Sequence, residues 1–420
     1  MDIYWIWFFI GLFVSLGCIV SSVKKYSLNS FVDPVFFSSL LFIFTFYLPM
    51  YFLPSTYSWY EFSEKSMFIV LVANICVTAG HIIGNYIPRE KIHNNSHKKR
   101  KVRFFRIPPD SIVIFIWCVG VLVYMAAYII KGIPVLSANI DVERQLFMSG
   151  AGFILQPAQI CINFAFFVFL IQRRYWLATV FGVVGLLIII LSGWRGNVLL
   201  MGVGVLMILS LQSIMKKKVV IYALGSVLLV AFSGIYRAYL SEKSIYGLTL
   251  EGPASILESS VLYVVLRLGI HADTFNMVVK HFDGFFMNGE AMLMDVAGIF
   301  GGGETTVVYY LKDLFGRWEG GGGLPPTMFG AFFMDFGLFG VAVLSMISAF
   351  FYSVLIRFFR LKIEANNFYY LFVSALGYAW LMAFLGTFFK YFFSVMLFHF
   401  FGYVAISFFI LLLNNKIKSA

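Results

Sequence analysis

The stretch MFGAFFMDFGLFGVAVLSMISAFFYSVLI, residues 328–356, decides the class of fold, because Asp335 is its only charged side chain. An α-helix needs about 20 apolar residues to cross the hydrocarbon core of a bilayer, and this stretch is longer than that. Comparable stretches recur along the chain. We predict about eleven membrane-spanning helices, over residues 3–23, 35–53, 66–87, 111–130, 153–171, 176–192, 197–214, 219–235, 328–356, 367–386 and 393–413.

The amino-acid composition supports the same class of protein. Hydrophobic residues make up 61% of the 420-residue chain and charged residues only 12%, whereas soluble domains carry about 25% charged residues. A soluble protein could not hide that much apolar surface from water. The sequence therefore predicts an all-α polytopic membrane protein.

Basic residues follow every second predicted span, which predicts the orientation of the chain. Lysine and arginine near the ends of spans are retained in the cytoplasm, so we expect the N-terminus outside and the C-terminus in the cytoplasm. The net charge of +11 would then lie mostly on the inner face. There we expect it to interact with anionic lipid headgroups, and we do not expect it to bind nucleic acid. The inner groups are Lys24 and Lys25, the cluster at 89–106, Arg173 and Arg174, 216–218, Arg357, Arg360 and Lys362, and Lys416 and Lys418.

One long polar connection stands apart from the short links. We divide the chain into residues 1–235 with eight spans, an outward loop at 236–327 that carries the catalytic residues, and residues 328–420 with the last three spans. Glycine runs in the loop predict hinges that let it fold over a site. The chemically capable side chains of the loop are Arg237, Arg267, His271, Glu290, Glu304, Arg317 and Glu319.

Four arginines on the outward side are candidates for binding the diphosphate of a lipid-linked substrate. Arg144 follows two acids, Arg195 lies in the glycine turn LSGWRGNVLL, Arg267 is four residues before His271, and Arg317 precedes Trp-Glu. A guanidinium presents a planar fork of donors that matches phosphate oxygens. Snorkelling to the interface or pairing with a nearby acid is the alternative for each, and it is favoured at Arg317.

His271, Glu304 and Glu319 are the candidate proton acceptors. The unperturbed pKa of histidine lies near neutrality, so His271 could take a proton from a substrate hydroxyl or donate to phosphate. The alternative is a histidine that is hydrogen-bonded to structural neighbours. Glu290 is a further rival, and position in the sequence alone does not rank these residues.

A few polar residues lie inside apolar stretches. Asp335 is an intramembrane carboxylate and hence a functional candidate, although a hydrogen-bonded packing role beside the neighbouring glycines competes. We expect His81 and His399 to be satisfied core residues, and Lys390, in FFKYFF, to be an interface lysine. There is no Cys-x-x-Cys, Asp-x-Asp or Walker motif, so the sequence predicts neither a metal nor a cofactor.

At GGGGLPPTMFGAFFMDFGLFGV (320–341), together with RGN at 195–197, the chain resembles the bacterial O-antigen or repeat-unit polymerases, the Wzy group. In that group a glycine-proline-threonine entry followed by G-x-x-x-x-D-F-G-x-x-G opens a late membrane helix. The related O-antigen ligases share the plan of many helices and one large outward loop, so they remain an alternative. A flippase or transporter is a further alternative, disfavoured by the single large loop.

The resemblance implies a membrane glycosyltransferase of GT-C-like architecture in the inner membrane, which polymerises undecaprenyl-diphosphate-linked oligosaccharide repeat units at the periplasmic face. Its partners would be the lipid-linked glycan donor and acceptor and membrane lipids, with no metal or nucleotide sugar. The resemblance leaves open whether a chain-length regulator binds.

Overall fold

The structure is a computed structural model in which all regular elements of the described residues are helices, and this confirms the predicted all-α class. The residues that it describes are 3–56, 61–86, 108–137, 143–144, 146–147, 152–193, 196–213, 269–299, 306–316, 324–363 and 366–419.

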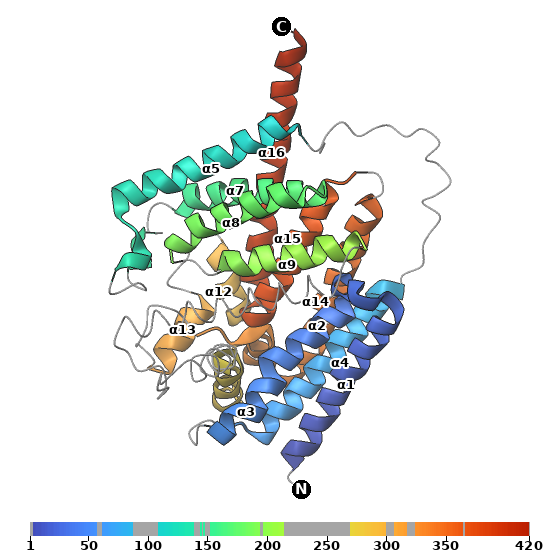
Figure 1. Cartoon of the computed structure of the whole chain (residues 1–420). Coiled ribbons are helices and arrows are strands. Elements are labelled where there is room, and N and C mark those ends of the chain that lie inside the picture. Colours follow the sequence, from blue (N-terminus) through green and yellow to red (C-terminus); the bar gives the residue numbers. More distant parts are fainter. Residues whose placement is uncertain are drawn as a thin grey trace, which may run out of the picture. The chain divides into compact units, whose positions relative to one another are not determined.

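Figure 1 labels the α-helices in chain order, except for a helix before α12 that covers residues 269–281; the short η elements carry no label. The others are α1 (Ile3–Tyr26), η1 (Ser27–Val32), α2 (Pro34–Phe42), η2 (Ile43–Tyr47), α3 (Leu48–Thr56), α4 (Glu64–Tyr86), α5 (Asp110–Lys131), η4 (Pro134–Leu136), α7 (Gly152–Ile171), α8 (Tyr175–Leu191), α9 (Gly196–Leu211), α12 (Glu290–Ile299), α13 (Val307–Leu314), α14 (Thr327–Ile363), α15 (Tyr369–Leu385), η6 (Phe388–Phe393) and α16 (Ser394–Ser419).

The chain is a multi-pass membrane protein. Among the described residues, seven helices are long and apolar enough to cross a membrane, and Tyr175–Leu191, Val198–Leu211 and Tyr369–Leu385 are shorter apolar helices. Every predicted span coincides with one of these helices, except that the eighth, 219–235, lies outside the described residues. The last span begins earlier than we predicted, at Phe388, because a π-helical turn precedes α16.

The described helices form two compact units, each assembled from separate segments of the chain. Unit 1 comprises Met1–His81, Leu209–Tyr352 and Tyr378–Ser394, and unit 2 comprises Ile82–Ile208, Ser353–Gly377 and Val395–Ala420.

In unit 1, α1 lies beside α2 and α4 (Figure 1). The hydroxyl of Tyr4 donates to the carbonyl of Met50 at 3.3 Å, and at the other end of α1 Ser22 donates to Asp33 at 2.6 Å. The segment α2–α3 therefore runs antiparallel to α1, as two successive membrane crossings must. Figure 1 and the side-chain amide of Asn74 in α4, which donates to the carbonyl of Gly11 in α1 at 3.1 Å, place the third crossing beside the first.

Helix α14 runs parallel to α4 within unit 1. Near their starts, the ammonium of Lys65 lies 6.0 Å from the centroid of the Phe333 ring. Fifteen or so residues later, a Cβ on Gly80 would collide with the carbonyl oxygen of Met346. Small residues let membrane helices pack backbone to backbone, so Gly80 sets the close approach of α4 and α14.

An aromatic core fixes the entry of α14. Phe329 stacks on Phe42 with ring centroids 5.2 Å apart, and Phe384 meets both rings edge-on at 4.9–5.0 Å. The ring of Phe46 lies 5.5 Å from that of Phe275, on the helix at 269–281. All five side chains are fully buried. Edge-to-face and stacked ring pairs stabilise a core beyond the effect of burying their apolar area. This aromatic core therefore holds the helix at 269–281 and α14 together.

Unit 2 is built around α5, α7 and α8. Arg174, just before α8, forms an ion pair with Asp110 at the start of α5. At the opposite end of α5, the hydroxyl of Tyr128 donates to the carbonyl of Ile188 near the end of α8. The two helices therefore run parallel with α7 between them in the chain. Their core contains Tyr124, Tyr128, Phe147, Leu155, Ala158, Ile162 and Ile189.

Candidate functional site

Helix α14 is broken at Gly337, inside the aspartate-phenylalanine-glycine segment of the motif. Gly337 has φ +61° and ψ −149°, a conformation that glycine tolerates and other residues rarely adopt. A Cβ at this position would also lie 2.6 Å from Cζ of Phe286. The second glycine of the motif is therefore required by both backbone conformation and packing.

The break leaves backbone carbonyls of α14 without their helical partners. The segment just before α12 donates hydrogen bonds to them instead. The N–H of Met287 donates to the carbonyl of Met334 at 2.8 Å, and the N–H of Asn288 donates to that of Asp335 at 3.2 Å. Broken helices are tolerated at membrane depth only where such groups find new partners. The broken turn thus binds the segment that leads into α12.

The side chain of Asp335 caps the first turn of α12. Its Oδ1 accepts from the N–H groups of Gly289 at 3.1 Å and Ala291 at 2.9 Å, and its Oδ2 accepts from the N–H of Met292 at 2.9 Å. The first N–H groups of a helix have no partner within the helix, and the helix dipole favours a negative charge there. A fully buried carboxylate is stabilised by three such donors.

This geometry decides between the two interpretations of Asp335. Both of its oxygens are engaged by the backbone of the 289–292 segment, so the residue anchors α12 to α14. The hydrogen-bonded structural role is the one that the structure supports. Asp335 is a positioning residue, and what it positions is the remainder of α12.

Helix α12 carries a second buried aspartate, Asp295, which is 1% exposed. Its Oδ1 has no hydrogen-bond partner among the described residues. The hydroxyl of Thr387, the backbone N–H of Lys390 and the Lys390 ammonium lie close enough to its carboxyl to favour the charged form. The Thr387 oxygen is buried and has no partner within normal hydrogen-bond geometry among the described residues. A buried polar atom without a partner is costly and uncommon, so this place needs an explanation.

Gly298, one turn after Asp295, brings α12 against two further elements. A Cβ on Gly298 would lie 2.8 Å from Cγ2 of Thr306 and 3.2 Å from Cδ of Lys390. Thr306 precedes α13, and its hydroxyl oxygen is buried without a partner as well. Because positions three apart share a helix face, Asp295 and Gly298 present one surface to Thr306, Thr387 and Lys390.

The environment of Asp295 places its protonation near neutral pH. Burial disfavours the charged carboxylate and raises its pKa from 3.8 to about 7. Thr387 and Lys390 favour the charged form and limit the rise, whereas the charge of Asp335 adds to it. A carboxyl group with a pKa near the working pH suits the transfer of a proton.

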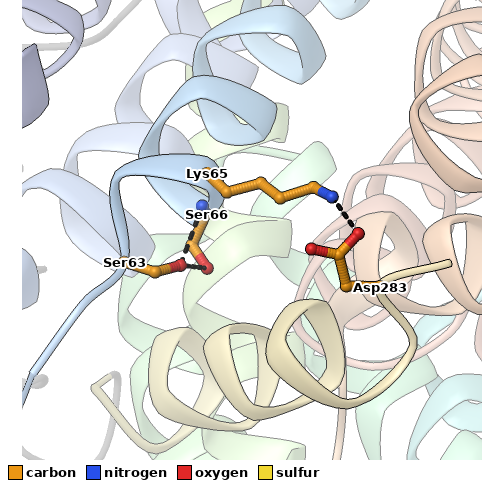
Figure 2. A network of polar contacts seen from close by, with 4 residues as sticks. All are labelled: Ser63, Lys65, Ser66 and Asp283. Carbon is orange, nitrogen blue, oxygen red and sulfur yellow. Dashed lines mark hydrogen bonds and ion pairs between the residues drawn. The ribbon is translucent and has the colours of Figure 1, made fainter.

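Polar contacts at the start of α4 fix the helix that precedes this site (Figure 2). Ser63 caps α4 by accepting from the N–H of Ser66 at 3.1 Å. Oδ1 of Asn276, on the helix at 269–281, accepts from the N–H of Ser63 at 3.0 Å and the hydroxyl of Ser66 at 2.8 Å. Two residues after that helix, Asp283 forms an ion pair with Lys65. These contacts hold the chain between residue 269 and α12 against the start of α4.

The structure places His271 on the helix at 269–281, where its side chain is half-buried. It lies one helical turn before Phe275, which belongs to the aromatic core. Glu290 is exposed on the first turn of α12. The described contacts do not bring either residue to Asp295.

Arg144, in unit 2, lies along the glycine turn that follows α8. A Cβ on Gly193, which has φ +80°, would lie 3.4 Å from Cβ, Cγ and Cδ of Arg144. The arginine stem thus packs on the turn to which Arg195 belongs in the sequence. The other predicted site residues, which are Arg195, Arg267, Glu304, Arg317 and Glu319, lie outside the described residues.

A family model for O-antigen polymerases matches residues 33–387 of the chain. The chain belongs to the O-antigen polymerase family. No curated protein and no solved structure matches it. Membership gives the protein a role in O-antigen polysaccharide biosynthesis as a glycosyltransferase-like enzyme, with lipid-linked glycans in the membrane as its class of substrate.

The sequence did not single out Asp295 in this O-antigen polymerase family member, although an aspartate in AMLMDVAGIF is unusual for so apolar a segment. For Lys390, which we expect to be an interface lysine, the structure adds that its stem packs against α12 and that its charge acts on Asp295. The matched region ends at residue 387, so it includes Asp295 and Thr387 and stops short of Lys390.

Two histidines have structural roles, as predicted. Ring nitrogens of His81 lie 2.7 Å from the hydroxyl of Ser38 and 3.0 Å from the carbonyl of Ala349. Nδ1 of His399 lies 2.8 Å from the carbonyl of Val395, one turn earlier in α16. In the part of the chain that the structure describes, no three His, Cys, Asp or Glu side chains gather as a metal site.

Proposed function

We propose that this protein polymerises undecaprenyl-diphosphate-linked repeat units into a surface polysaccharide at the periplasmic face of the inner membrane. A growing glycan would leave its lipid diphosphate and be attached through its reducing end to a newly arrived lipid-linked repeat unit. The family match over residues 33–387 carries this proposal. The buried carboxyl of Asp295 on α12 supports the proposal, because its pKa of about 7 suits a group that accepts a proton and the reaction must remove one proton from the acceptor.

Contacts within unit 1 support the proposed side of the membrane. Basic residues Lys24 and Lys25 lie in the last turn of α1, and the positive-inside rule assigns that end to the cytoplasm. The start of α1 is the end at which Tyr4 contacts Met50. Since α4 and α14 run parallel to each other, their starts, with Lys65 and Asp335, share one end, which would lie in the periplasm if the spans alternate as proposed.

The arginines would act on the leaving group. Bond cleavage between the anomeric carbon and the phosphate oxygen places negative charge on the lipid diphosphate, and preorganised cations stabilise such developing charge. Arg144, Arg195, Arg267 and Arg317 are the proposed donors. The packing of Arg144 on Gly193 supports a joint role for Arg144 and Arg195, because Gly193 is only two residues before Arg195 in the sequence.

The proton of the acceptor hydroxyl requires a base. From the sequence, His271, Glu304 and Glu319 are the proposed candidates. A histidine is suited to this task at neutral pH, and a glutamate is suited if its pKa is raised.

The proposed polymerisation is tested by the glycolipid profile of cells in which the gene is deleted. A polymerase defect leaves single repeat units on the cell surface lipid, and a plasmid copy of the gene restores long chains. Long chains that remain on the polyprenyl lipid would instead identify a ligase. Repeat units retained on the cytoplasmic side would identify a flippase. A normal profile would refute all three.

A further inference from the structure

Three buried side-chain oxygens at one surface of α12 have no partner within normal hydrogen-bond geometry among the described residues, although the Thr387 hydroxyl lies close enough to Asp295 to favour its charged form. They are Oδ1 of Asp295 and the hydroxyl oxygens of Thr306 and Thr387, on residues that are at most 1% exposed. They come from three elements, namely α12, the start of α13, which is the next helix, and the residue before η6, which is about ninety residues further along the chain. A single orphan oxygen could be an accident of packing, but a chain that leaves three together forms a site with unused hydrogen-bonding capacity.

The close approach of these groups depends on the absence of a side chain at residue 298. A Cβ there would come within 2.8 Å of Thr306 and 3.2 Å of the Lys390 stem. Gly298 thus lets both residues approach the helix face that carries Asp295. The resulting site combines one carboxyl, two hydroxyls and one ammonium, which is a donor and acceptor set that matches sugar hydroxyl groups.

We propose that Asp295, Thr306, Thr387 and Lys390 bind the reacting hydroxyl of the acceptor sugar, with Asp295 as the catalytic base. This inference rests on the proposed polymerase function and assigns the base to a residue other than His271, Glu304 or Glu319. The acceptor oxygen forms a bond to the anomeric carbon of the donor. The bond from that carbon to the phosphate oxygen breaks, and the diphosphate departs with the electron pair. The hydroxyl proton passes to Oδ1 of Asp295.

The surroundings of Asp295 fit this role. The charged and titratable groups that face it are Lys390 and Tyr391 from η6 and Asp335 from α14. Lys390 favours the carboxylate, which is the form that accepts a proton, while Asp335 opposes it. Burial supplies the largest effect and raises the pKa of Asp295 to about 7. A stronger base than an ordinary aspartate results, and half of it remains ionised at neutral pH.

The first test uses membranes that contain the full-length protein, with polyprenyl-diphosphate-linked repeat units extracted from the deletion cells as substrate. Asp295→Asn keeps the shape but cannot accept a proton, so polymer formation should fall by about a hundredfold to ten-thousandfold. Binding of the lipid-linked substrate to the variant should change little, because a base acts mainly in the transition state. Asp283→Asn is the matched control, since Asp283 pairs with exposed Lys65 and lies outside the proposed site.

The variant also separates a catalytic role from a structural one. Burial raises the pKa of the Asp295 carboxyl, so the native state holds its proton more tightly than the unfolded chain, and this contribution to stability is lost as pH rises from about 4 to about 7. At neutral pH a neutral amide avoids that cost. Asp295→Asn should therefore melt no lower than the parent protein while losing polymer formation. Normal polymer formation by well-expressed Asp295→Asn would overturn the assignment.

The pH profile gives an independent readout that does not depend on that variant. The rate should rise about tenfold from about pH 6 to about pH 8 for a pKa of about 7. Lys390→Met removes the charge that favours the carboxylate, so its rising limb should move to higher pH. His271→Gln should keep the limb of the parent protein. Loss of the limb in His271→Gln, or an unmoved limb in Lys390→Met, would overturn the proposal.

These results are distinguishable from failure of the polymerase function. If deletion cells still make long chains, the polymerase proposal fails whatever Asp295 does. If deletion abolishes long chains and Asp295→Asn restores them as well as the parent gene does, only the assignment of the base fails. Thr306→Val adds a third comparison, because loss of one binding hydroxyl should raise KM for the acceptor more than it lowers kcat.

Discussion

Replacement of Asp335 by asparagine should release the first turn of α12. The amide keeps one oxygen, which can still accept from Gly289 and Ala291, but it turns a donor toward the N–H of Met292 that now meets Oδ2 at 2.9 Å. One hydrogen bond to a charged group is lost, worth about 1.5–3 kcal/mol. The other two change from charge-assisted to neutral and weaken.

The local cost of this substitution is about 2–4 kcal/mol, which is about a thirtyfold to several-hundredfold increase in local opening. Hydrogen–deuterium exchange of the peptide that covers residues 287–293 measures it directly, since exchange follows the free energy of local opening. Asp283→Asn, which breaks a half-exposed ion pair with Lys65 worth at most about 1 kcal/mol, is the control. Exchange no faster in Asp335→Asn than in this control would refute the capping role.

Loss of the cap should also affect chemistry. Helix α12 carries Asp295 about one turn beyond the capped residues, so fraying at its start should lower polymer formation without changing the amount of protein in the membrane. Polymer formation unchanged in a variant whose α12 exchanges fast would separate the anchor from the site, and would count against a functional role for Asp295.

Three further predictions concern packing, orientation and the leaving group. Gly80→Ala should destabilise the protein by about 1–3 kcal/mol, because its Cβ would collide with a carbonyl of α14, whereas Gly17→Ala, with open space around it, should leave the melting temperature unchanged or higher. In a variant without the four native cysteines, an impermeant thiol reagent should label a cysteine at Ser244 but not at Ser96 in intact spheroplasts, and the reverse pattern would invert the topology. Arg195→Ala should cost about a hundredfold in polymer formation and Arg195→Lys less, and normal activity of the alanine variant at equal expression would make Arg195 a membrane anchor.

The sequence predicted the spans because their signal is local. A segment such as 111–130 must satisfy its own backbone and match the thickness of the bilayer, and the structure has α5 at Asp110–Lys131. It predicted the structural role of His81 for the same reason, since a polar ring within an apolar helix requires partners. Neither inference needed knowledge of which helices meet.

The sequence ranked the carboxylates poorly, because a carboxylate's role depends on what surrounds it. Asp335 attracted attention as a charge inside a span, yet its three donors come from residues 43 to 46 positions earlier in the chain. Asp295 looked unremarkable within a loop. Its importance comes from Thr387 and Lys390, about ninety residues away, which no local pattern could bring to it.

The sequence by itself determined that this is a multi-pass helical membrane protein, and the glycine-proline-aspartate motif indicated its family. Both follow from apolar length and from backbone requirements such as the positive φ of Gly337, which are written into neighbouring residues. Only the tertiary structure decided that Asp335 is saturated by backbone donors while Asp295 is left with an oxygen unpaired. Hydrogen bonding and burial fix the protonation and reactivity of a carboxyl group, and both arise where segments distant in the chain pack together.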